Sequence, residues 1–144
     1  NYRMSNISAG IGRGQMEVLD QRVAARRKNN QFYQDLFKDF EGIAVFVEPN
    51  QDYKSNHWLS AITIDPQKAA FSCEELRLKF LDQNIESRPL WKPMHLQPIF
   101  ANTPYYGTKV AEELFNNGLC LPSGSSLTDA DRIRIKDVIV KLKQ

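Results

Sequence analysis

Apolar residues recur with the period of an α-helix at both ends of this chain, and short runs rich in β-branched residues lie between them. From Ser5 to Phe40 only three glycines oppose a helix, so we expect one long helix that bends near Gly10–Gly14. The runs Ile43–Val47 and Trp58–Ile64 predict two strands. Because only a short loop joins them, they should pair antiparallel.

The second half of the chain alternates helix and strand signals. A capping box at Ser72–Glu75 predicts a helix with Leu76, Phe80 and Leu81 on its inner face, followed by a strand at Ile85–Leu90. An irregular loop should run from Trp91 to Tyr106 and lead to a short helix capped by Thr108. A strand at Leu119–Leu121 and a last helix, which begins at a second capping box at Thr128–Asp131, complete the expected elements. This order predicts an α+β fold: an open, partly antiparallel sheet with helices packed on one face, preceded by the long bent N-terminal helix. The 144 residues fit a single domain.

Charge and cysteine content exclude several classes of function. The 19 Lys and Arg residues are matched by 17 Asp and Glu residues and are not gathered on one segment, so we expect no nucleic-acid partner. The longest apolar run, Ile43–Val47, is too short to cross a membrane. Cys73 and Cys120 lack metal-ligand spacing, which predicts no metal site and two reduced, partly buried thiols in a cytoplasmic protein.

Three features that resemble functional motifs have ordinary structural interpretations. Gly10-Ile11-Gly12-Arg13-Gly14 does not match the dinucleotide fingerprint, because Gln15 stands where a third glycine is needed and no strand precedes it. We expect these glycines to let the helix approach a neighbour closely. The run Arg26–Asn30 is polar all round and should meet solvent or a partner, with Arg26–Lys28 as a solvated face of the helix. We expect His57 to be a surface or capping residue.

One loop combines the chemistry of a binding site. Between Arg88 and Pro98, two cations, an indole, an imidazole and a carboxamide lie among three prolines, which limit the entropy lost on binding a ligand. Cations suit phosphates or a carboxylate, and an indole offers a flat face. The residues themselves leave a ligand-facing role and a packed structural role equally open. The candidate substrate contacts are Arg88, Trp91, Lys92, His95 and Tyr105.

The sequence resembles one enzyme family from end to end. Asn-Tyr-Arg-Met-Ser-Asn-Ile-Ser-Ala-Gly-Ile-Gly, at positions 1–12, is similar to a signature segment of the DegT/StrS-type sugar aminotransferases. The helix around Gln15–Arg27, the loop Arg88–His95 and the segment Leu119–Ser123 follow in the family's order. The resemblance implies the small C-terminal domain of a fold-type I enzyme that uses pyridoxal 5'-phosphate (PLP). Such enzymes transfer an amino group, usually from glutamate, to a nucleotide-linked keto-sugar.

The resemblance also implies how residues 1–144 relate to a longer protein. The lysine that binds PLP would lie upstream, in a larger cofactor domain, and residues 1–40 would be the helical segment that leads from it. No lysine of this chain would then be catalytic, and the isolated piece would be inactive and would expose surface around Ile7, Ile11 and Trp91. In the homodimer, Asn1 would reach the cofactor phosphate bound in the neighbouring subunit, and Arg3 would lie close by, facing cofactor or substrate anions. The five loop candidates would lie at the substrate mouth.

Two other functions remain open on the sequence. Related family members are dehydratases in which the lysine is replaced, and only the upstream segment separates them from aminotransferases. The other alternative is a stand-alone binding or dimerisation module without a cofactor.

Overall fold

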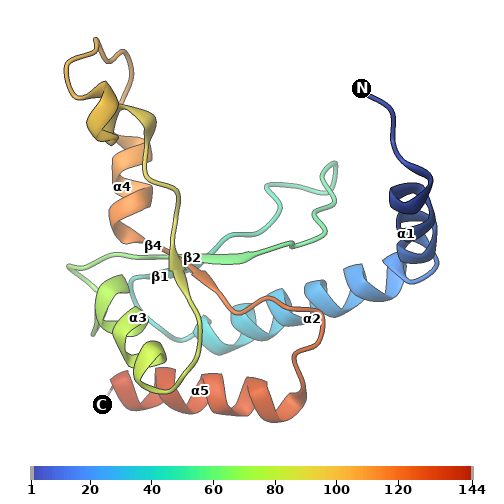
Figure 1. The fold of residues 1–144 in the computed structure, drawn as a ribbon. Coiled ribbons are helices and arrows are strands. Elements are labelled where there is room, and N and C mark those ends of the chain that lie inside the picture. Colours follow the sequence, from blue (N-terminus) through green and yellow to red (C-terminus); the bar gives the residue numbers. More distant parts are fainter. Residues whose placement is uncertain (1, 144) are drawn as a thin grey trace.

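The computed structural model describes residues 2–143 (Figure 1). In chain order, its elements are α1 (Asn6–Met16), α2 (Leu19–Phe37), β1 (Ile43–Val45), β2 (Ser60–Ile64), α3 (Cys73–Asp82), β3 (Arg88–Pro89), the 3-10 turns η1 (Met94–Leu96) and η2 (Pro98–Phe100), α4 (Val110–Asn117), β4 (Gly118–Leu121) and α5 (Asp129–Lys143). Apart from the division of the first helix into α1 and α2, helices and strands follow the predicted order, and the α+β class is confirmed.

The four strands form one sheet in the order β1-β2-β4-β3. Ile43 pairs with Ile64, Ala61 with Cys120, and Cys120 in turn with Arg88. All three pairings between the described strands are antiparallel, so the sheet is antiparallel throughout that part of the chain rather than only partly so. Three strands, β1, β2 and β3, are shorter than their predicted runs, and β3 is limited to Arg88–Pro89 because Pro89 has no amide to extend its ladder. β4 instead begins one residue earlier than predicted, at Gly118.

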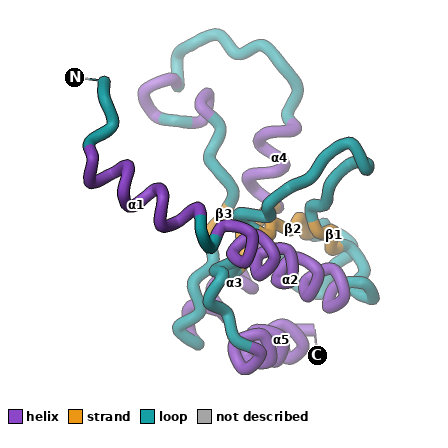
Figure 2. The backbone as a smooth tube through the Cα atoms, turned by 90° about the vertical axis from the view of Figure 1, so that its right-hand side faces the viewer, coloured by secondary structure: helices purple, strands orange, loops and turns teal. Residues whose placement is uncertain are grey.

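The core lies between one face of the sheet and three helices. Alternate residues of β2 and β4 point inward, where they meet the apolar faces of α2, α3 and α5, and all these residues are at most 3% exposed: Ile62, Ile64, Leu119, Leu121, Tyr33, Phe37, Leu76, Phe80, Ile135 and Ile139. These helices lie on one side of the sheet, whereas α4 extends from the other side (Figures 1 and 2). The prediction that helices cover one face is therefore confirmed for the core helices. Leu81, expected on the inner face of α3, is 59% exposed because it lies about 100° around the helix from buried Phe80.

The predicted long helix breaks at a different place. α1 runs straight through Gly10, Gly12 and Gly14, and the break falls at Glu17–Val18, where Val18 adopts φ −115° and ψ 4°. Glycine weakens a helix but keeps its hydrogen-bond donor, so the α1 ladder survives. Within the described residues, nothing lies within 4 Å of a Cβ built at any of the three glycines. The predicted close approach therefore does not occur inside this chain.

Helix boundaries follow their capping residues closely. The Ser5 side chain accepts from the Ser8 amide, and Ser72 and Glu75 form the predicted capping box. Thr128 and Asp131 exchange the same pair of bonds at the start of α5. The predicted Thr108 cap is wrong: Lys109 occupies the N-cap of α4, and the Thr108 carbonyl accepts from the Tyr105 hydroxyl instead.

Candidate functional site

A cavity of about 670 Å³ lies beside the sheet, lined by residues of β3, the end of β4 and the first turns of α5. The segment before β3, the end of β4 with the turn that follows it, and the first turns of α5 form its walls. Two of the sequence candidates line it, Arg88 and Trp91, together with Trp58, Ser87, Cys120, Ser123 and Arg134. The cavity is therefore the part of this chain best shaped to take a ligand.

Two indole rings stand at this cavity. The ring centroids of Trp58 and Trp91 are 6.3 Å apart with an interplanar angle of 38°, and the two residues are 60% and 68% exposed. Exposed tryptophan faces can stack on a planar group such as a nucleobase. Sequence reasoning treated Trp58 only as the start of a strand. Its pairing with Trp91 depends on the β2–β4–β3 order, which no local pattern encodes.

The cavity carries two guanidinium groups. Arg88 forms an exposed ion pair with Glu86, with Nε 2.7 Å from the carboxylate oxygen, and Arg134 donates to the carbonyl of Gln83. The hydroxyl oxygen of Ser87 is buried and has no hydrogen-bond partner among the described residues. Arginine forks suit phosphate oxygens, so a phosphorylated ligand fits the charge of this wall.

Two further candidates lie together outside the cavity lining. The imidazole of His95 stacks on the ring of Tyr105, with centroids 3.8 Å apart, and its Nε2 lies 3.0 Å from Oε1 of Glu112. The loop that carries them holds the turns η1 and η2, so it is more regular than its prolines predict. His95 and Tyr105 thus form a second, ordered cluster near α4.

The remaining candidates are not brought into either group. Lys92 is exposed, and its carbonyl accepts from the Gln97 amide at 3.4 Å. Arg3 is exposed in the extended segment before α1, which lies far from the loop between β3 and α4 (Figure 1). Asn1 falls outside the described residues. Within residues 2–143, Arg3 is therefore not brought to the predicted substrate contacts.

Part of the polar middle of α2 is buried within this chain, which corrects the sequence expectation, whereas Lys28 is exposed as predicted. Asn29 and Asn30 are each 1% exposed. Asn29 Nδ2 donates to the carbonyl of Gly124 at 2.9 Å, and Arg26 donates to the carbonyls of Trp58 and Ser123. Arg26 therefore ties together two walls of the cavity.

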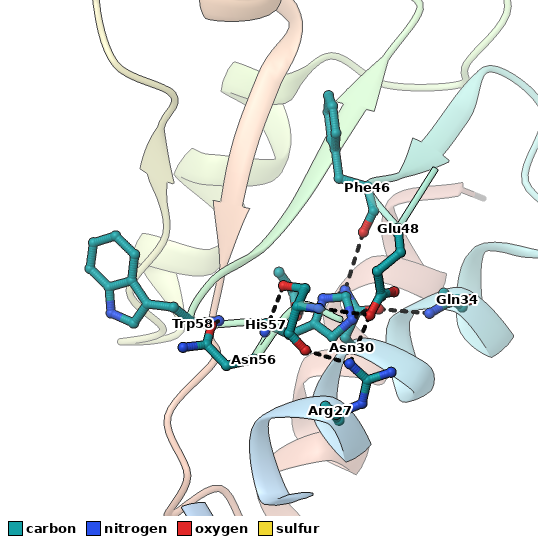
Figure 3. Close-up of polar contacts among 10 residues, drawn as sticks. Arg27, Asn30, Gln34, Phe46, Glu48, Asn56, His57 and Trp58 are labelled. Atoms are coloured by element: carbon teal, nitrogen blue, oxygen red, sulfur yellow. Dashed lines mark hydrogen bonds and ion pairs between the residues drawn. The ribbon is translucent and has the colours of Figure 1, made fainter. Parts of the chain in front are cut away.

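A connected ion-pair network fixes the loop that leads to Trp58 (Figure 3). Arg27 Nη1 lies 2.7 Å from Oε1 of Glu48, and His57 Nε2 lies 3.2 Å from the other oxygen of that carboxylate. His57 is 6% exposed, with φ at +46°, so the expectation of a surface histidine is wrong. The Arg27 guanidinium and surrounding backbone amides lower the pKa of Glu48 to about 2. The carboxylate thus stays ionised as the anchor of the loop.

The described residues hold no group of three or more His, Cys, Asp or Glu side chains arranged to bind a metal ion. Between residues 2 and 143, no helix combines the length and apolar character required to span a bilayer. Both cysteines are free and buried, as expected. Burial raises the pKa of the Cys73 thiol to about 11 and also raises the pKa of the Cys120 thiol.

The proteins with similar sequences include sugar aminotransferases. EpsN of Bacillus subtilis is 38% identical over 99% of this chain and 37% of its own length. GDP-perosamine synthase of Caulobacter vibrioides is 34% identical over 94% of this chain and 36% of its own length. The chain thus spans little more than a third of these relatives.

Solved structures share the fold at lower identity. DesV of S. venezuelae superposes with a TM-score of 0.84 at 22% identity, covering 99% of this chain and 37% of its own. Helicobacter pylori PseC, an aminotransferase of pseudoaminic acid biosynthesis, gives a TM-score of 0.83 at 20% identity, covering 99% and 38%. The sequence pattern of one family matches residues 1–141. The chain belongs to the DegT/DnrJ/EryC1/StrS aminotransferase family.

Proposed function

We propose that residues 1–144 are the C-terminal small domain of a PLP-dependent aminotransferase that moves an amino group from glutamate to a nucleotide-linked keto-sugar. The observation that carries the proposal is the family match over residues 1–141. Similar proteins include GDP-perosamine synthases and a dTDP-4-amino-4,6-dideoxy-D-glucose transaminase of Shigella dysenteriae. The enzyme would act in the cytoplasm, in the synthesis of amino sugars for cell-surface glycans.

The exposed N-terminal helix supports a larger assembly. α1 buries no residue, and Ile7 and Ile11 are 77% and 63% exposed. An apolar face of this kind is costly in water unless something covers it. In the proposal, residues 1–40 lead from the cofactor domain, and the rest of the homodimer covers α1 and the surface around Trp91.

The fit of the chain to PLP rests on its donor groups. The described residues that line the cavity include no lysine. In the proposal, the lysine that binds PLP lies upstream of this chain. Arg3 is an exposed guanidinium and suits the anions of the cofactor or substrate held by the neighbouring subunit, and in the proposal the cofactor phosphate is assigned to Asn1 as well. When bound, PLP supplies the electron sink for amino transfer, and these residues supply charge and orientation.

The cavity and the adjoining loop would receive the nucleotide-sugar. Trp91, together with Trp58, offers flat faces for the base, and Arg88 offers a guanidinium to the diphosphate. Lys92 would add a second cation, and His95 and Tyr105 would contact the sugar or phosphates at the mouth. A volume of about 670 Å³ is within the range of small-molecule sites.

A dehydratase is the second candidate. Escherichia coli GDP-4-keto-6-deoxy-D-mannose-3-dehydratase, solved with hydrated PLP, shares the fold with a TM-score of 0.74 at 23% identity, over 91% of this chain and 34% of its own. The fold of this region is therefore compatible with either reaction. The cofactor-free module is the third alternative, which the shared family disfavours.

The test uses the full-length protein purified with PLP. GDP-4-keto-6-deoxy-D-mannose and its dTDP-linked counterpart are offered together with isotopically labelled glutamate, and the sugar products are analysed by mass spectrometry. We expect a product in which a labelled amino nitrogen replaces the ketone oxygen. A product that has lost a hydroxyl oxygen and gained no nitrogen would establish the dehydratase instead. A full-length protein that binds no PLP would contradict both.

A further inference from the structure

Glu112 is the closest polar partner of His95 in the structure. His95 lies in η1 and Glu112 in the first turn of α4, and His95 Nε2 approaches Oε1 of Glu112 to 3.0 Å. Their side chains are 17% and 28% exposed, so both are partly withdrawn from water. A charge-assisted hydrogen bond in such a place is stronger than one on an open surface.

The same contact decides which ring nitrogen remains available. A carboxylate can only accept, so His95 must carry its proton on Nε2 to make this bond. Among the described residues, Nδ1 has no hydrogen-bond partner. Tyr105 covers one face of the ring at 3.8 Å, and its own hydroxyl donates to the Thr108 carbonyl. The imidazole is therefore fixed in orientation with Nδ1 as its free polar atom.

The backbone around His95 is equally constrained. Pro93 precedes η1 and Pro98 opens η2, and the amides of Leu96 and Gln97 close the η1 turn onto Pro93 and Met94. A side chain held by packing and by a turn of this kind loses little freedom when a ligand binds. His95 therefore meets a physical requirement of a binding group, because its side chain is already ordered before a ligand binds.

We propose that Glu112 is a positioning residue that holds His95 with Nδ1 directed to the nucleotide-linked sugar. This inference rests on the proposed function, in which His95 lies at the substrate mouth. Glu112 itself does not touch the substrate; it accepts the Nε2 proton and so selects the nitrogen that does.

Two amide substitutions separate the nitrogens of His95 in the full-length enzyme. The Gln side chain in His95→Gln places an amide nitrogen near the Nε2 position, which keeps the bond to Glu112 and loses the ligand contact. The Asn side chain in His95→Asn places an amide near Nδ1, which keeps the ligand contact and loses Glu112. We expect KM for the keto-sugar that the wild type turns over to rise about tenfold in His95→Gln and less in His95→Asn. A merely structural role predicts the reverse order, which would overturn the proposal.

Substitutions on α4 test the partner. Glu112→Ala should raise KM about tenfold with kcat nearly unchanged, and Glu112→Gln should recover most of the affinity because its amide oxygen still accepts from Nε2. Glu113→Gln is the matched control, an exposed carboxylate in the same first turn of α4, and should leave KM unchanged. A Glu112→Ala enzyme with unchanged KM would contradict the proposal.

Nitrogen NMR of the His95 ring provides a readout independent of turnover. The full-length protein should show a proton on Nε2 that loses its slow solvent exchange in Glu112→Ala. A ring protonated only on Nδ1 would overturn the inference even in an active aminotransferase. Conversely, an enzyme that aminates no keto-sugar but shows the Nε2 proton would refute the proposed function while leaving the His95–Glu112 pair in place.

Discussion

Arg27 and Glu48 join the middle of α2 to the loop that leads to Trp58, with the guanidinium Nη1 2.7 Å from the carboxylate oxygen. The Ser55 amide donates to the same oxygen at 3.1 Å, and His57 lies against the other. One carboxylate therefore joins α2 to both ends of the loop between β1 and β2, and through Trp58 it positions one side of the cavity (Figure 3).

The first prediction concerns the acid stability of this anchor. The Arg27 guanidinium lowers the pKa of Glu48 to about 2, whereas the pKa of a glutamate in the unfolded chain is about 4.3. Because the folded pKa is the lower one, the carboxylate stabilises the fold above the unfolded pKa, and this contribution is lost as the pH falls through the folded pKa. Glu48→Gln should therefore be less stable at neutral pH and should depend less on pH across that window. Urea midpoints measured at several pH values test this, with exposed Glu41→Gln as the control; an unaltered pH slope in Glu48→Gln would refute it.

The second prediction concerns a buried amide. Asn30 is 1% exposed, and its side chain accepts from Gln34 at 2.6 Å and donates weakly toward the Phe46 carbonyl and the Ser60 hydroxyl at 3.4 Å. Asn30→Ala should lower the free energy of unfolding by about 1–3 kcal/mol, because its partners stay buried without a bond. Gln31→Ala, on the exposed side of α2, should change it by less than about 0.5 kcal/mol. Equal effects of the two substitutions would show that Asn30 is not part of the buried network.

The contrast between α2 and the strands explains what the sequence could predict. Local signals predicted the strand that contains Ile43–Val45, the Ser72–Glu75 capping box and the final helix with its stripe through Ile135 and Ile139. They did not fix every boundary, since Lys109 rather than Thr108 is the N-cap of α4. Asn29 and Asn30 were expected to meet solvent or a partner because polar residues usually lie at the surface. Both are buried because their amide groups donate hydrogen bonds to backbone carbonyls that are distant in sequence, and the periodicity of apolar residues does not predict such contacts.

The residues of the candidate site also fall into those that local sequence signals predict and those that only the tertiary fold brings together. The proline-rich loop indicated Arg88, Trp91, His95 and Tyr105 because their chemistry is concentrated in one segment. Trp58 and Glu112 could not be found in this way, since each meets its partner only through the tertiary fold, across 33 and 17 positions of sequence. Signals within one loop were readable, and contacts between loops were not.

The third prediction concerns the two thiols. Burial raises the pKa of Cys73 to about 11, and its Sγ donates to the Asn117 carbonyl at 2.9 Å. Since the thiolate is the reactive form, labelling of the folded chain by a disulfide reagent at neutral pH should be much slower than labelling of the unfolded chain. The rate for Cys73 should rise with pH up to that value. Rapid stoichiometric labelling of both cysteines in the native state would contradict their burial.

The fourth prediction concerns Arg3. In the full-length enzyme, Arg3→Ala should weaken binding of PLP or of the nucleotide-sugar by about tenfold to a hundredfold, the scale of one charge-assisted hydrogen bond. Equilibrium titration with PLP and with the keto-sugar measures both affinities. Arg13→Ala removes another exposed guanidinium, on α1, and should leave both unchanged. Equal affinities in the wild type and Arg3→Ala would remove Arg3 from the site.

The central claim is that this chain completes a cofactor site that the neighbouring subunit holds. Subunit complementation tests it most directly. One full-length variant carries Arg3→Ala, a second lacks the upstream lysine that binds PLP, and differently tagged subunits are mixed and exchanged so that co-purification reports mixed dimers. The account predicts that transamination by the mixed dimers exceeds the sum of the two separate variants, because one site then receives both an intact lysine and an intact Arg3. Mixed dimers that form and yet show no activity beyond that sum would contradict it.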